Sequence, residues 1–148
     1  MLKPALLILA WLIWLGAAEK PPVLFRVHLQ APEGAKGMVT VPLTLFNPPE
    51  TIAIRSIPEL SEKDVQRVQS STSGKILVEF SDFGRTKLEL ATSTGRGLIL
   101  VVIVNGRVVY APLIDIPLTR GGLALPASSL SPQEIEVLNE QASKTGKN

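Results

Sequence analysis

The stretch LILVVIVNGRVVYAP, residues 98–112, decides the fold of this chain. Its first seven residues are all apolar, which is typical of a strand buried on both faces. Asn105 and Gly106 follow directly, and a second strand-like run begins at Arg107. An Asn-Gly pair between two apolar runs is the strongest short-range signal of a β-hairpin, because both turn residues need a positive φ. The stretch therefore predicts an antiparallel hairpin, with Asn105, Gly106 and Pro112 as its fold determinants.

Four further strand-like segments lie upstream of this hairpin. Residues 23–30 and 39–45 alternate apolar and polar side chains, and shorter segments of the same kind occur at 52–54 and 75–80. Alternation with a period of two is typical of half-buried strands. Pro42 has no N–H to offer to a ladder, so we expect segment 39–45 to lie at a sheet edge.

Three capping patterns predict three helices. Ser61, with Asp64 three residues later, predicts a short first helix, and Ser81 predicts a second helix over residues 82–94. The third is expected to begin at Ser131, which combines a capping box with proline at the first helical position. The expected buried stripe of the second helix comprises Phe83, Leu90 and Ala91, with Leu88 at its margin.

Strands and helices in this order predict an α+β fold, a mainly antiparallel sheet with about three helices on one face. Residues 19–148 are long enough to form one domain with a core of its own. The chain contains no cysteine, so packing alone must stabilise it and no disulfide is expected.

Four segments also carry a family pattern in a consistent order, PELSEKDV (58–65), VEFSDFG (78–84), residues 98–112 and LSPQEI (130–135). The matching positions that we take as fold signature are Pro58, Ser61, Asp64, Ser81, Asn105, Gly106 and Pro112. In these segments the chain resembles the head subdomain of the first periplasmic domain of SecD and SecDF, accessory subunits of the bacterial protein-export translocase. The resemblance implies the α+β fold of that head over residues 51–144, preceded by N-terminal strands in 19–50 and followed by a disordered tail in 145–148.

The resemblance implies only part of the family's activity. SecD proteins use ionisable residues within membrane-spanning helices for proton-coupled movement, and we expect no such helices here. The family's head is thought to contact emerging preproteins. What the resemblance implies for this chain is therefore passive binding of unfolded or extended polypeptide, which is an argument by analogy of fold.

The first 18 residues predict export. Lys3 precedes an apolar run over residues 5–15, and Gly16-Ala17-Ala18 places small residues before a cut at Glu19. These are the three parts of a secretory signal peptide. The alternative is an uncleaved membrane anchor, but a spanning helix needs about 20 apolar residues. The absence of cysteine points to the bacterial cell envelope, with the protein periplasmic or secreted and in contact with the membrane only if the signal is uncleaved.

Composition and side chains give little support for other functions. The chain has 15 Lys and Arg against 13 Asp and Glu, without the basic and aromatic cluster of a nucleic-acid interface. His28 is the only histidine, and we expect it to be solvated rather than a metal ligand or part of a triad. Glu79 and Asp82 are explained by a strand surface and a helix N-terminus, and the glycines of 95–97 by a helix end. We therefore predict no enzyme activity and no catalytic, cofactor or metal site.

The sequence favours an exported, non-catalytic module that binds extended polypeptide or an envelope protein. Segments 38–45 and 107–114 are the candidate edges for strand addition. Tyr110 is the best candidate for a contact surface, with core packing as its other interpretation. Two alternatives stay open: a membrane-anchored structural or sensory domain, and a small secreted hydrolase that would have to use His28.

Overall fold

The computed structural model describes residues 19–147, so the expected signal peptide lies outside the described residues. Twelve elements follow one another along the chain. They are β1 (Phe25–Leu29), β2 (Met38–Leu43), β3 (Glu50–Arg55), β4 (Leu60–Ser61), the 3₁₀ turn η1 (Glu62–Asp64), β5 (Val65–Ser70), β6 (Lys75–Phe80), α1 (Asp82–Thr94), β7 (Leu100–Val104), β8 (Arg107–Tyr110), β9 (Gly122–Pro126) and α2 (Pro132–Thr145).

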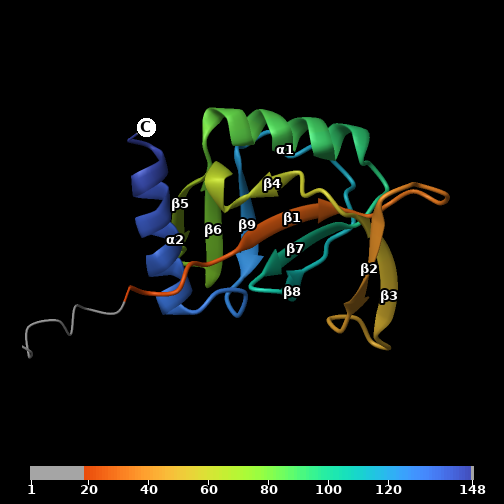
Figure 1. Cartoon of the computed structure of the whole chain (residues 1–148), viewed down its shortest axis with the longest axis horizontal. Helices are drawn as coiled ribbons and strands as arrows, with labels where there is room; N and C mark the ends of the chain where they lie inside the picture. Colours follow the sequence, from red (N-terminus) through yellow and green to blue (C-terminus); the bar gives the residue numbers. More distant parts are fainter. Residues whose placement is uncertain (1–18, 148) are drawn as a thin grey trace, which may run out of the picture.

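The strands form three antiparallel sheets, ordered β4-β1-β7-β8, β2-β3 and β5-β6-β9. The predicted antiparallel α+β class is confirmed. The prediction of a single sheet with about three helices on one face is wrong. The described chain has two α-helices, and they do not lie together. In Figure 1, α1 runs across the top of the molecule, and α2 runs along its left side beside β5.

The hairpin at Asn105 and Gly106 forms as predicted. Both residues have positive φ, 48° and 81°, and Val104 pairs with Arg107 across the turn. The pairing register shifts farther from the turn: Ile103 pairs with Val108, but the next residue of β7, Val102, pairs with Tyr110. This bulge places an extra residue in β8 and changes which face its side chains occupy. As a result Val108 and Tyr110 pack in different hydrophobic clusters, although strict alternation would place them on one face.

The prediction of a short helix capped by Ser61 is wrong. The structure has a single 3₁₀ turn, η1, and the chain then continues into β5. The capping chemistry is present, since Asp64 Oδ2 accepts a hydrogen bond from the Ser61 N–H at 2.9 Å. A cap, however, only starts a helix, and here the polar turn at 71–74 joins β5 to β6 as an antiparallel pair. The pairing buries Val65 and Val68 in the core, which tertiary packing favours over a short helix.

Helix α1 has the predicted bounds but not the predicted orientation. Phe83 and Leu90 are 71% and 64% exposed, and the buried positions include Gly84 and Leu88. A Cβ on Gly84 would lie 2.9 Å from the Phe80 Cβ, so the helix approaches the sheet through this glycine. Close approach on the glycine side turns Phe83 outward. Of the predicted stripe, Ala91 is buried as expected, whereas Phe83 and Leu90 are exposed and Leu88 is fully buried instead of marginal.

The main core lies between the four-stranded sheet, the β5-β6-β9 sheet and the two helices. Its largest fully buried side chains include Phe25 and Phe80, whose ring centroids are 6.2 Å apart. A second, smaller cluster lies on the other face of β7. There the β2-β3 hairpin places Leu43 and Ile54 against Val101. Strand β2 pairs only with β3 within residues 19–147, which confirms the edge position expected from Pro42.

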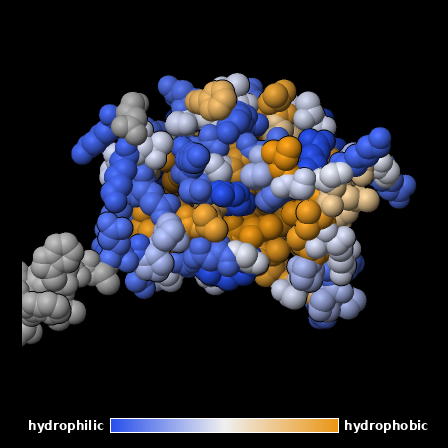
Figure 2. Space-filling view, viewed as in Figure 1, coloured by the Kyte–Doolittle hydropathy of each residue, from blue (hydrophilic) through white to orange (hydrophobic). Residues whose placement is uncertain are grey.

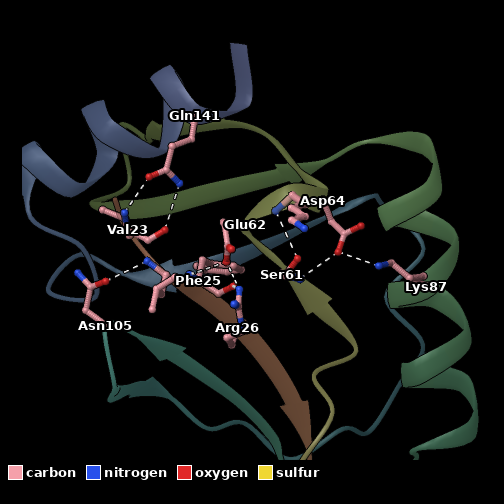
Figure 3. A network of polar contacts seen from close by, with 11 residues as sticks. Val23, Phe25, Arg26, Ser61, Glu62, Asp64, Lys87, Asn105 and Gln141 are labelled. Carbon is pink, nitrogen blue, oxygen red and sulfur yellow. Dashed lines mark hydrogen bonds and ion pairs between the residues drawn. The ribbon is translucent and has the colours of Figure 1, made fainter. Parts of the chain in front are cut away.

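Polar side chains tie the first residues of the described chain to the rest of the fold (Figure 3). The Gln141 amide accepts from the Val23 N–H at 2.8 Å and donates to the Val23 carbonyl at 3.1 Å. Asn105 Oδ1 accepts from the N–H of Leu24 at 2.9 Å. The turn of the hairpin and helix α2 therefore both hold the entry into β1.

Asn139 of α2 closes the outer edge of β5 in the same way. Its side-chain amide accepts from the Val68 N–H and donates to the Val68 carbonyl, each at 2.8 Å. An amide side chain thus takes the place of a neighbouring strand at this edge, where backbone groups would otherwise lack partners under the helix.

Replacing Asn139 with alanine is expected to lower the free energy of unfolding by about 2 kcal/mol, because two partly buried backbone groups lose their partners at once. Chemical denaturation followed by circular dichroism measures the change. Glu140→Ala on the neighbouring exposed position is the control and should cost less than about 0.5 kcal/mol. Equal stability of the two variants would contradict a closing role for the Asn139 amide.

Candidate functional site

A cleft of about 290 Å³ lies between β8 and β9. Its walls are mostly apolar and come from the end of β8, the segment that follows it, and the start of β9. The lining residues are Leu100, Tyr110, Pro112, Leu113, Ile114, Asp115, Ile116, Leu118, Gly122, Leu123 and Ala124.

Two strand edges border this cleft. Within residues 19–147, β8 pairs only with β7 and β9 pairs only with β6, so each strand has one edge without a strand partner. The two strands contact each other. Unpaired strand edges carry N–H and C=O groups that can form a ladder with another extended chain.

Backbone hydrogen bonds hold the segment between the two strands in place. The Ile114 N–H donates to the Leu98 carbonyl at 2.9 Å, and the Leu118 N–H donates to Thr92 Oγ1 of α1 at 2.8 Å. Between these anchors Leu113 and Ile116 remain largely exposed, the latter at 61%. Large apolar side chains on a fixed, exposed loop are typical of a contact surface.

The cleft is lined by one acidic residue, and basic residues lie in the pocket next to it. Asp115 is the only acidic or basic residue among the lining residues, and its Oδ1 accepts from the Ile116 N–H at 2.9 Å. A second pocket of about 300 Å³ shares Gly122, Leu123 and Ala124 with the cleft and is lined by Arg85, Arg120 and Glu79 among others. The apolar cleft thus opens beside a basic turn.

Glu79 in this second pocket is already paired. Its two carboxylate oxygens accept from Arg67 Nε at 2.9 Å and from Arg67 Nη2 at 3.1 Å. These hydrogen bonds hold the pKa of Glu79 below its ordinary value, and the nearby charge of Arg85 acts in the same direction. Glu79 is therefore ionised near neutral pH, and its charge is offset by Arg67.

A further apolar area lies on the outer face of β7 and β8, where it meets the β2-β3 hairpin (Figure 2). Its partly buried side chains include Val41, Phe46, Ile52, Ile103 and Val108. Val108 belongs to this area and Tyr110 to the main core and the cleft, so β8 separates two apolar surfaces.

His28 is not solvated as predicted. It is 8% exposed, and its Nδ1 lies 2.8 Å from the Arg55 carbonyl oxygen, to which it donates. The reason is that β1 lies between β4 and β7 and is also contacted by β3, whose last residue, Arg55, places its carbonyl oxygen at the His28 ring. No group of three or more His, Asp or Glu side chains suited to a metal ion occurs in residues 19–147.

The predicted site residues are spread over the fold. Tyr110 and Pro112 line the cleft, whereas Asn105 and Gly106 form the turn at the far end of β8. The remaining signature residues sit in other parts of the fold: Pro58 precedes β4, Ser61 and Asp64 cap η1, and Ser81 caps α1 with its Oγ accepting from Gly84 N–H at 3.2 Å.

The sequence patterns did not predict the side chains that complete the cleft. Leu113 and Ile116 lie in PLIDIPL, residues 112–118, where apolar side chains occur between prolines in a loop. Exposed apolar residues in such a loop are a signal that could have indicated a contact surface. The contribution of β9 could not be found this way, because it depends on how two sheets approach each other.

The described architecture defines a small α+β domain of antiparallel sheets with an apolar cleft beside two strand edges. No family model and no curated protein sequence matches the chain. Solved structures that share its fold include two of SecDF. One is described as the structure and function of a membrane component, SecDF, that enhances protein export; it has a TM-score of 0.58 and 19% sequence identity, with 82% of this chain and 62% of that chain covered.

The second is SecDF in a super-membrane-facing form, with a TM-score of 0.58, 20% identity, and 82% of this chain and 19% of that chain covered. The chain thus spans less than two thirds of the length of either protein. The resemblance to SecD and SecDF expected from the sequence is confirmed at the level of the fold. Within residues 19–147 no helix is long and apolar enough to cross a membrane.

Proposed function

We propose that this protein is an exported, non-catalytic module that binds extended polypeptide, acting in the bacterial cell envelope. The cleft between β8 and β9 is the binding site, and the unpaired edge of β8 forms a ladder with the bound chain. The observation that carries the proposal is the combination of a strand edge with an apolar cleft beside it.

The chemistry of the cleft suits an extended segment with apolar side chains. A strand presents alternate side chains to one side, so every second residue of a bound peptide can enter the space between Tyr110 and Leu123. Backbone hydrogen bonds to β8 supply affinity with little dependence on sequence, and the apolar walls select for hydrophobic residues.

The fold shared with SecDF also supports a polypeptide-binding role. SecDF is described as a membrane component that enhances protein export, and the chain shares the fold of part of it. A domain that binds extended polypeptide outside the cytoplasm is consistent with the fold of a component that enhances protein export.

Ile116→Asp is expected to weaken peptide binding about tenfold, because it places a charge at the mouth of the apolar cleft. The probe is a neutral eight-residue peptide with valine at alternate positions and both ends blocked, titrated into the purified protein in a calorimeter. Ile116 is exposed, so the substitution should leave the thermal melting curve nearly unchanged.

Leu90→Asp is the matched control, since Leu90 is equally exposed but lies on α1 outside the cleft lining. Met38→Asp tests the competing edge of β2. Loss of binding in Met38→Asp with full binding in Ile116→Asp would move the site to β2 and refute the cleft. No binding by the unmodified protein would refute the proposed function.

A further inference from the structure

Two arginines meet at the turn that leads into β9. Arg120 is part of this turn, and Arg85 reaches it from the first turns of α1. The side chain of Arg85 lies against Gly121, where a Cβ would be only 2.4 Å from Arg85 Nε. Both arginines line the pocket next to the cleft.

The glycines of this turn leave the space that the arginines occupy. Gly121 has a φ of 80°, a conformation that favours glycine, and a side chain there would displace Arg85. A Cβ on Gly122 would lie 2.6 Å from the Val78 carbonyl oxygen, so β9 also approaches β6 through a glycine. The basic pocket therefore depends on two residues without side chains.

Neither arginine has an anionic partner in the part of the chain that the structure describes. No ion pair or side-chain hydrogen bond of Arg85 or Arg120 occurs within residues 19–147. The nearest acid in the pocket lining is Glu79, whose two oxygens are bound by Arg67. Two positive charges thus face a pocket whose single acid is already neutralised.

The basic pocket and the apolar cleft are continuous. The start of β9 separates them, and its residues Gly122, Leu123 and Ala124 line both the cleft and the basic pocket. A peptide of a few residues that fills the cleft can therefore reach Arg85 and Arg120 with one end. Arginine guanidinium groups bind carboxylates through paired, charge-assisted hydrogen bonds.

We propose that Arg85 and Arg120 bind a carboxylate of the polypeptide that occupies the cleft, so that the preferred ligand is an extended apolar segment with an acidic group at one end. The inference rests on the proposed function and names its substrate class. The group recognised is an aspartate or glutamate side chain or a free C-terminal carboxylate.

The test compares peptides that differ only in this group. The neutral peptide described above is made with aspartate or asparagine at either its first or its last residue, and with a free or an amidated C-terminus. We expect one carboxylate position to bind about fivefold tighter than its neutral counterpart, since both arginines are exposed and water competes with them. The preference should decrease at high salt.

Arg85→Gln/Arg120→Gln is expected to abolish the preference while the neutral peptide still binds, which also shows that the variant is folded. Lys63→Gln/Arg96→Gln removes the same charge from exposed positions outside both pockets and should retain the preference.

Equal binding of acidic and neutral peptides by the unmodified protein would overturn the inference and leave the proposed function standing. A preference that survives in Arg85→Gln/Arg120→Gln would also overturn it, because the carboxylate would then bind elsewhere. Binding of no peptide at all would refute both.

Discussion

Replacing Phe80 with alanine is expected to lower the free energy of unfolding by about 3–5 kcal/mol. Phe80 ends β6, is fully buried, and packs against Phe25 with ring centroids 6.2 Å apart. It also contacts the helix that follows, since Gly84 approaches its Cβ. Removing the ring leaves a cavity where a strand, a second strand and a helix meet, and such sites cannot collapse to fill it.

Phe83→Ala provides the matched control for this substitution. Phe83 lies three residues later and is 71% exposed, with Lys87 Nζ 5.0 Å from its ring centroid as its polar neighbour. We expect its replacement to cost less than about 1 kcal/mol. Chemical denaturation of both variants separates the outcomes, and similar losses would contradict the observed orientation of α1.

Replacing Gly84 with valine is expected to cost about 3 kcal/mol. The new Cβ would meet the Asp64 carbonyl oxygen at 3.1 Å, the Asp64 Cβ at 3.0 Å and the Phe80 Cβ at 2.9 Å. Two of these atoms belong to side chains fixed by packing and one to the backbone, so the helix must move away from β6 and η1. Overpacking of this kind typically costs 1–3 kcal/mol or more.

The helix propensity of valine must be separated from this packing effect. Ser93→Val places the same residue at an exposed position of α1 and measures the propensity cost alone. Gly84→Ala is intermediate, because its Cβ makes the same contacts while alanine favours the helix. A Gly84→Val protein as stable as Ser93→Val would show that α1 does not need its close approach.

The parts of the fold that the sequence predicted correctly depend on local chemistry. Asn105 and Gly106 need positive φ, and Ser81 and Ser131 satisfy the first N–H groups of their helices, so neighbouring residues decide these features. The errors arose where distant residues decide. Ser61 caps only a 3₁₀ turn because β6 pairs with the residues after it, and Phe83 points outward because Gly84 faces the sheet.

The candidate site was predictable to the same extent. Tyr110 and Pro112 could be placed on the strand after the hairpin, and both line the cleft. The opposite wall comes from β9, and the basic turn comes from α1 and the residues before β9. Their proximity depends on the approach of two sheets, for which residue patterns along one strand carry no information. The burial of His28 was not predicted, because it too depends on how distant strands pack.

The contacts of helix α2 set an order of events. A polypeptide is made from its N-terminus, so Val23 and the residues of β5 exist long before Asn139 and Gln141. Until α2 is made, the backbone amides at both places have no partner from the helix, and the edge of β5 is open to other extended chains. We therefore expect this fold to stay unfinished on the nascent chain until α2 has been made, and the docking of α2 to be the step that completes it.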